Sequence, residues 1–182
     1  MFVISPLGGA ERKIAERAAP VEKCHCARSL SWSPESRRLA MPDKPSPDQP
    51  ISIVLLPIET GEKQRLTAPP GMSVDSDPAF SPDGRMLAFT RTASGVPVPF
   101  GIAELYVIPL SSSLAPAGAP KRLTFDNHLA LSPTWTTRRQ IIFASDRAGT
   151  GSLLWRIDVA GGAEPRRVES VGEDASVPGG LA

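Results

Sequence analysis

Three segments of the chain repeat one order of residue types, and this repetition constrains the fold more than any other feature. The segments are SLSWSPESRRLAM from Ser29, SDPAFSPDGRMLAF from Ser76 and LSPTWTTRRQIIFA from Leu131. In each segment an aromatic residue, at 32, 80 or 135, precedes an aliphatic residue seven positions later, at 39, 87 or 142. The aromatics are 48 and 55 residues apart, which is the spacing of a repeating supersecondary unit.

Each segment is followed by a second apolar run and a short closing stretch. The apolar runs are ISIVLLPI at 51–58, ELYVIPL at 104–110 and LLWRIDV at 153–159. The closing stretches are QRLT at 64–67, KRLT at 121–124 and RRVE at 166–169. Short runs rich in β-branched, aliphatic and aromatic residues, bounded by Pro, Gly, Asp and Ser, are typical of strands and tight turns. One unit therefore contains four short strands.

Long helices are not expected in this chain. Twenty of the 182 residues are proline, roughly twice the usual share of about 5%. The stretch AERKIAERAA at 10–19 comes nearest to a helical pattern, but in the repeat order it corresponds to the closing stretch GGAEPRRVE at 161–169. We expect a strand there, with a short helix as the alternative. A four-stranded antiparallel sheet cannot bury both faces alone, so stacked sheets, as in a β-propeller, are predicted.

The repeated pattern also resembles a known family. The order P-x-(W/F)-S-P-D-G-(R/K), an aliphatic strand, a Leu-Tyr-Val-type strand and a closing Arg-Leu-Thr resembles the WD-like repeats of the TolB-type β-propeller family. Unit two, 77–125, matches throughout, whereas unit one has Glu-Ser at 35–36 in place of Asp-Gly and unit three replaces the turn with 136–139. Unit three keeps SDRAG at 145–149, similar to the family's S-D-R-x-G hairpin. The resemblance implies an all-β fold with blades of four antiparallel strands.

The order of the strands predicts about three complete blades, flanked by partial ones, in one propeller-type domain. The expected parts are a partial blade of two strands with a link at 1–28, blades at 29–70, 71–130 and 131–170, and a stub of a next blade at 171–182. Because propellers close with about four to eight blades, we expect an incomplete ring that is a segment of a larger one. Open blade faces and unpaired strand edges would favour self-association.

No candidate catalytic, cofactor or metal site emerges from the sequence. A phosphate-binding loop, G-x-x-x-x-G-K-(S/T), and a nucleophile elbow, G-x-S-x-G, are both absent. The Cys-His-Cys sequence at 24–26 invites a metal interpretation, but a zinc site wants four ligands, so a loop with free thiols is favoured. His128 is expected to cap or pack in the link between two units. Asp75 and Asp77 could hold a cation, but hydrogen bonds to turn backbone are the favoured interpretation.

Structural roles are expected for the aromatic, turn and hairpin positions of the repeat. Pro82 would set the backbone of a type I turn that Gly84 completes, and the tryptophans, including Trp155, would pack as core residues between blades. In the hairpin, Asp146 would accept backbone N–H bonds and Arg147 would pair with a neighbouring blade. The repeat positions are Trp32, Pro34, Leu39, Phe80, Pro82, Asp83, Gly84, Leu87, Trp135, Ile142, Asp146, Arg147 and Gly149.

Charge and hydropathy narrow the class of partner. With 20 basic and 19 acidic residues the net charge is +1, so direct nucleic-acid binding is not expected. Paired arginines follow the same turn in two units and would line one rim, as a surface for an anionic partner or as solvated turn charges. They are Arg37, Arg38, Arg138 and Arg139. No apolar run approaches the roughly 18 residues of a membrane span, and residues 1–9 lack signal-peptide features, so we expect a soluble segment, periplasmic or cytoplasmic.

These observations predict a non-catalytic module for protein interaction or ligand sensing. The family resemblance implies repeats that mediate protein contacts in a cell-envelope complex. Similar arrays also occur behind winged-helix or serine/threonine kinase domains in bacterial regulators. The alternative is the propeller accessory domain of a prolyl-oligopeptidase-like serine hydrolase, whose catalytic domain would bring a G-x-S-x-G elbow and a downstream histidine.

Overall fold

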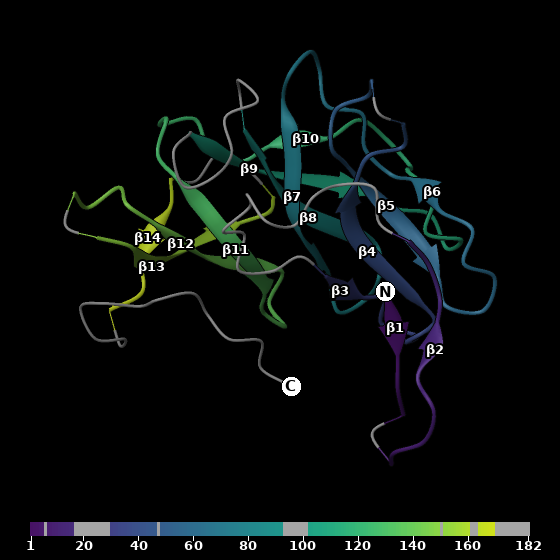
Figure 1. Cartoon of the computed structure of the whole chain (residues 1–182). Helices are drawn as coiled ribbons and strands as arrows, with labels where there is room; N and C mark the ends of the chain where they lie inside the picture. The colour runs from purple at the N-terminus through teal and green to yellow at the C-terminus, as the bar shows by residue number, and fades with distance from the viewer. Residues whose placement is uncertain are drawn as a thin grey trace.

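The computed structural model describes residues 1–5, 7–16, 30–46, 48–92, 102–149, 151–160 and 164–169. Throughout these ranges the regular structure is β-strand, arranged in one two-stranded and three four-stranded sheets (Figure 1). The predicted all-β fold is confirmed. In the same ranges there is no helix of the length and apolarity that crossing a bilayer requires.

Each four-stranded sheet is an antiparallel meander in which the order in space follows the order in the chain. The first blade contains β3 (Ser31–Trp32), β4 (Arg38–Asp43), β5 (Ser52–Pro57) and β6 (Gln64–Arg65). The second contains β7 (Val74–Phe80), β8 (Met86–Thr92), β9 (Ala103–Pro109) and β10 (Lys121–Arg122). The third contains β11 (Ala130–Trp135), β12 (Gln140–Ser145), β13 (Leu153–Asp158) and β14 (Arg166–Arg167).

A two-stranded hairpin precedes the first blade. It consists of β1 (Phe2–Val3) and β2 (Arg12–Lys13), paired antiparallel. Residues 10–16 therefore contain a strand where a short helix was the alternative. Ile14 of the hairpin packs with Leu39, Met41 and Leu56 of the first blade, so the hairpin covers the outward face of that sheet. This is the position that the last two strands of a preceding unit would take.

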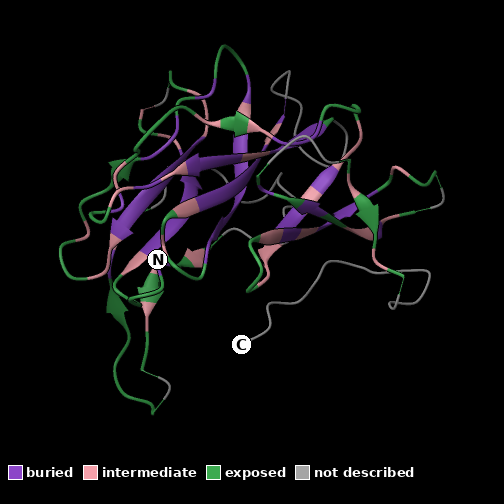
Figure 2. Ribbon diagram, turned by 180° about the vertical axis from the view of Figure 1, so that it is seen from behind, coloured by how far each residue is buried: buried purple, intermediate pink, exposed green. Residues whose placement is uncertain are grey.

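Two further hydrophobic clusters lie between successive blades. One joins the first and second blades through residues such as Ile53 and Phe89, and the other joins the second and third through residues such as Leu105 and Phe143. Strands of the first two blades are buried on both faces, which explains their continuous apolar runs. In the third blade, burial is less continuous along β12 and β13, because among the described residues the second blade covers one face of this sheet (Figure 2).

The first strands of the three blades lie side by side along the inner edge of the stack. The backbone N–H of Phe80 donates to Ser31 Oγ at 3.1 Å, which joins β7 to β3. The backbone N–H of Ser132 donates to Asp77 Oδ2 at 3.3 Å, which joins β11 to β7. Blade packing is therefore reinforced by polar contacts between inner strands.

The inner strands β7 and β11 carry bulges at equivalent places. Their pairing registers shift between Ser76 and Ala79 and between Leu131 and Thr134. At each shift a non-glycine residue has a positive φ, +49° at Asp77 and +48° at Ser132, and a proline follows it. Proline cannot donate to a sheet ladder, so a bulge is one of the few places in a strand that accepts it.

The third blade departs by one residue from the predicted spacing. Trp135 lies opposite Ile141, whereas the sequence repeat pairs it with Ile142. The turn between them is closed by a bond of 2.8 Å from Thr136 N–H to the Gln140 carbonyl and is one residue shorter than its counterparts. A slip of one residue moves a side chain to the other face of a sheet. Accordingly Ile141 is fully buried and is the true counterpart of the repeat leucine, and Ile142 is half-buried.

Candidate functional site

The turn after β7 forms as predicted. The backbone N–H of Gly84 donates to the Ser81 carbonyl at 2.9 Å, and Gly84 has a φ of +68°. Asp83 Oδ1 accepts bonds from Ser81 Oγ at 2.6 Å and from Arg85 N–H at 3.1 Å. These two bonds, that from Ser81 first, hold the pKa of Asp83 below its usual value. The carboxylate of Asp83 is therefore engaged in hydrogen bonds within the turn.

A hydroxyl at the start of this turn recurs in all three blades and was missed in the sequence. Ser33, Ser81 and Thr136 directly follow the repeat aromatic residue. Their oxygens accept the backbone N–H of the first residue of the next strand, at 3.0, 2.9 and 3.3 Å. The sequence shows this feature as a serine or threonine after each repeat aromatic. The hydroxyl oxygen connects the turn to the following strand.

The ends of the inner strands surround a hollow of about 360 Å³, which we call the aromatic hollow. Trp32, Phe80 and Trp135 contribute to it from the three blades. Its lining consists of Ser31, Trp32, Pro34, Ala79, Phe80, Ser81, Pro82, Thr134 and Trp135. Nearly all these residues belong to the repeat, so the repetition that builds the blades also gathers aromatic and proline side chains at one place.

The repeat aromatics differ in exposure. Phe80 is 9% exposed and lies in the cluster between the first two blades. Trp135 is half-buried against the next cluster and donates its indole N–H to the Ala79 carbonyl at 2.9 Å. Trp32 is 49% exposed, so the expectation that it packs between blades is wrong. In the described part of the chain the preceding hairpin has no inner strand, so no strand lies on the outer side of Trp32.

Three of the four rim arginines, Arg37, Arg138 and Arg139, lie on the turns at this end of the sheets, and Arg38 is the first residue of β4. Arg37, Arg138 and Arg139 are exposed. Arg38 instead reaches the second blade, where its Nη1 donates to the Ser113 carbonyl at 3.1 Å. Arg139 also lies beside a second, smaller hollow that adjoins the aromatic hollow through Trp135. Arg139 therefore places positive charge beside the aromatic surface, and the carboxylate of Asp83 lines the same smaller hollow.

Asp75 and Asp77 have protein partners in place of a cation. Arg91 donates to Asp75 through Nε at 2.6 Å and Nη2 at 2.9 Å, and the Asp75 side chain is fully buried. Burial acts to lower the pKa of Arg91, but the bond and the charge of Asp75 outweigh it and raise that pKa above its usual value. Asp77 accepts the backbone N–H of Ser132 in the next blade. Neither Asp75 nor Asp77 is among the residues that line the aromatic hollow.

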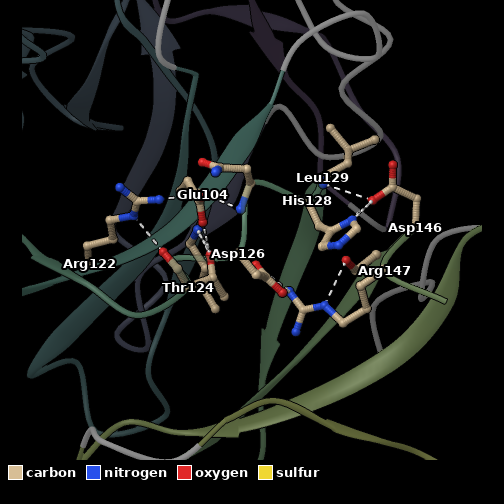
Figure 3. A network of polar contacts seen from close by, with 11 residues as sticks. Glu104, Arg122, Thr124, Asp126, His128, Leu129, Asp146 and Arg147 are labelled. Carbon is tan, nitrogen blue, oxygen red and sulfur yellow. Dashed lines mark hydrogen bonds and ion pairs between the residues drawn. The ribbon is translucent and has the colours of Figure 1, made fainter. Parts of the chain in front are cut away.

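The S-D-R-x-G hairpin anchors the link between the second and third blades (Figure 3). Asp146 Oδ1 accepts the backbone N–H of Leu129 at 2.9 Å and lies 3.4 Å from Nδ1 of His128. Asp146 is a backbone acceptor as expected, but the expected place of the donor, within the hairpin, is wrong, since Leu129 lies in the link. Arg147 Nη2 lies 3.3 Å from Asp126, also in the link. His128 and Arg147 thus tie the link to the third blade.

Arg147 lies deep in this contact. Its side chain is only 6% exposed, and its guanidinium is 5.0 Å from the ring centres of both Phe143 and Trp155. Burial lowers the pKa of Arg147, and the nearby carboxylate of Asp126 acts against this shift. Trp155 packs against the cluster between the second and third blades, but it is half-buried and lines a hollow, so it is not the buried core residue that was expected.

A second polar network at the link was not foreseen. Glu104 is almost fully buried and accepts bonds from Arg122 Nη2 at 2.5 Å, from the Thr124 hydroxyl and from Asn127 N–H at 3.2 Å. Thr124 Oγ1 also accepts the backbone N–H of Leu105 at 2.9 Å. Thr67 does the same for Ile53 in the first blade at 2.9 Å, so the Arg-Leu-Thr stretch closes both sheets.

Two parts of the expected organisation lie outside the described residues. They are the Cys-His-Cys sequence at 24–26 and the stub at 171–182. Among the residues that are described, no group of three or more His, Cys, Asp or Glu side chains is placed to hold a metal ion.

Comparison with known proteins gives a fold but no family assignment by sequence. No protein-family model matches the chain. TolB from Acinetobacter baumannii is similar in structure, with a TM-score of 0.68 and 24% identity over 91% of this chain and 36% of that one. A putative TolB from Agrobacterium tumefaciens has a TM-score of 0.61 and 23% identity over 79% of this chain and 46% of its own. The chain thus spans less than half of either protein.

Part of a peptidase is also similar in structure to this chain. The puromycin-hydrolyzing peptidase of Mycobacterium tuberculosis has a TM-score of 0.63 and 18% identity over 89% of this chain and 26% of that one. At these identities the similarities show the fold, which is that of a partial TolB-like β-propeller.

Proposed function

We propose that this chain, a partial TolB-like β-propeller in its fold, is a non-catalytic protein-interaction module that binds its partner at the aromatic hollow. The observation that carries the proposal is the exposure of Trp32, a large apolar side chain beside Trp135 and two prolines. Tryptophan is enriched among residues that dominate binding energy, since it buries a large rigid surface. An exposed tryptophan at a core position of the repeat is consistent with such an anchor.

The charges at the rim indicate which partner would fit. Arg37, Arg138 and Arg139 are exposed around the turns that border the hollow. Complementary charge accelerates association and selects partners, more than it adds to affinity. We therefore expect a protein segment with an apolar anchor residue and acidic flanking residues. Arg38 is not counted in this surface, because it holds the first blade to the second.

The proposal can be tested with peptides selected on the immobilised chain from a random library. Trp32→Ala should weaken the selected peptides at least about tenfold, as expected for a residue that anchors an interface. Met72→Ala is the matched control, because Met72 is 77% exposed and precedes β7 at the opposite end of the sheet from the hollow. Equal affinity for the two variants, or selection of no peptide, would overturn the proposal.

We further propose that the blades extend over 29–70, 71–130 and 131–170, with 1–28 and 171–182 belonging to partial blades. Limited proteolysis should then cut first between these parts. The chain would be a segment of a larger bacterial protein, such as a regulator with a winged-helix or kinase domain. Self-association through an open blade face is expected in isolation, and light scattering that gives a monomer mass at all concentrations would contradict it.

A second candidate function is supported by the puromycin-hydrolyzing peptidase, part of which is similar in structure to this chain. In that case the chain would be the accessory propeller of a serine hydrolase. The coding sequence next to this segment separates the two candidates. A G-x-S-x-G elbow with a downstream histidine would favour the hydrolase, whereas further blades or a regulatory domain would favour the interaction module.

A further inference from the structure

A second hollow lies where the link between the second and third blades meets the third blade. Its volume is about 590 Å³, and we call it the link hollow. It is lined by Leu123, Thr124, Phe125, Asp126, His128, Arg147, Trp155, Glu164 and Pro165. It shares no lining residue with the aromatic hollow. A volume of this size lies within the range of about 300 to 1,000 Å³ that is usual for small-molecule sites.

Two buried donors in its wall have no hydrogen-bond partner among the described residues. They are Nη1 of Arg147 and Nε1 of Trp155. Arg147 is held in place through its other nitrogens, since Nε donates to Ser145 Oγ at 3.2 Å and Nη2 faces Asp126. Buried donors in native proteins are nearly always satisfied by protein groups or by ordered water. The two donors therefore call for an acceptor from outside the described chain.

The charges around the hollow indicate what kind of acceptor this is. The positive charge of Arg147 is already met by Asp126 at 3.3 Å, and Glu164 adds a second carboxylate to the lining. A negatively charged ligand would approach both acidic side chains. An uncharged carbonyl oxygen can satisfy the donors without this repulsion.

Apolar surface lies beside these donors. Phe125 is 70% exposed, and Leu123 and Pro165 also line the hollow. The guanidinium of Arg122 is 4.9 Å from the centre of the Phe125 ring, which positions the ring despite its exposure. An apolar substituent could cover this ring, while the carbonyl group of the same ligand reaches the two donors.

We propose that the link hollow binds an uncharged amide, such as a peptide bond, whose carbonyl oxygen accepts from Arg147 and Trp155 and whose apolar substituent covers Phe125. The source of the amide is either a short peptide segment or a small amide compound. This inference does not rest on the proposed function, because the aromatic hollow is a separate surface.

The test uses the indole N–H resonances of the three tryptophans, assigned with Trp155→Phe. N-acetyl-leucine N-methylamide is titrated into the chain at millimolar concentrations, and the Trp155 resonance should move while those of Trp32 and Trp135 stay in place. N-acetyl-leucine, which carries a carboxylate in place of the methylamide, should bind several-fold more weakly. An unmoved Trp155 resonance, or tighter binding of the carboxylate, would overturn the proposal. A larger effect with longer capped peptides would identify a peptide segment as the source.

Variants separate binding from folding. Phe125→Ala removes an exposed ring and should weaken amide binding several-fold at an unchanged melting temperature. Arg147→Lys should abolish binding, and if this variant does not fold, Phe125→Ala still decides the outcome. Met72→Ala and Trp32→Ala should leave amide binding unchanged, and undiminished binding by Phe125→Ala would contradict the proposed pose. If the selected peptides turn out not to bind at Trp32, the proposed function fails, but this inference about the link hollow is unaffected.

Discussion

The indole nitrogen of Trp135 donates a hydrogen bond of 2.9 Å to the backbone oxygen of Ala79, which joins the inner strands of the third and second blades. Trp135→Phe keeps an aromatic ring but removes the N–H donor together with part of the indole, a change that Trp32→Phe also makes. We expect a loss of about 1 kcal/mol in the free energy of unfolding, as for a typical hydrogen bond, measured by urea denaturation. Trp32→Phe is the control and should lose less. Equal losses in both variants would show that this bond is not the cause.

Gly84 is required by the backbone of its turn. Its φ of +68° is costly for a side chain with a β-carbon, while the space around it is open enough, with Pro34 Cγ at 3.5 Å from the added atom. Gly84→Val should therefore destabilise the chain by about 1–3 kcal/mol through backbone strain. Gly84→Asn should cost less, because asparagine tolerates this conformation. Unchanged thermal stability of the valine variant would contradict the turn assignment.

The buried pair of Asp75 and Arg91 gives a different kind of prediction. Asp75→Asn leaves a half-buried guanidinium without its charge partner, and breaking such a pair costs about 3–5 kcal/mol. Replacing both residues with apolar ones, Asp75→Leu with Arg91→Met, should recover most of this loss because no charge is left buried. Chemical denaturation of the three proteins measures the effect. A double variant no more stable than Asp75→Asn would indicate that the contact matters for its shape and not for its charge.

Asp83 predicts a pH dependence of stability. Its pKa in the folded chain is lower than the ordinary value of 3.8, because Ser81 and the backbone of Arg85 bond to the charged form. The contribution of Asp83 is therefore fully present above about pH 4 and is lost as the pH falls through the lower, folded value. The effect should be small, since the side chain is exposed to solvent.

Urea denaturation of the chain and of Asp83→Asn is repeated from about pH 6 to about pH 2. The difference between the two proteins separates the contribution of Asp83 to the free energy of unfolding from those of the other carboxylates. The stability gap between the two proteins should narrow on acidification. A gap that stays constant over this range would show that ionised Asp83 contributes nothing to the turn.

The repetition of residue types was enough to predict the sheets, because a strand of four to eight apolar residues between turn residues leaves few alternatives. The repeat assigned the wrong residue, Ile142, as the partner of Trp135, because the turn between the two strands is one residue shorter than in the other blades. The sequence gives no separate sign of this shortening. The exposure of Trp32 was also hidden, because it depends on which strands lie beside it. The contacts of Glu104 and Arg147 could not be predicted from the sequence for a similar reason. Their partners come from the link between blades, whose path the repeat does not determine.

The separation of the hydrophobic clusters has a consequence for how the chain comes apart. Each cluster joins only two neighbouring sheets, so stability is a sum of nearest-neighbour terms, as in linear repeat proteins. The third blade shares one cluster, whereas the second shares two. Amide hydrogens of β12 and β13 should therefore exchange with solvent through openings that leave the middle sheet closed. Loosening would begin at an outer sheet and travel inward, one interface at a time.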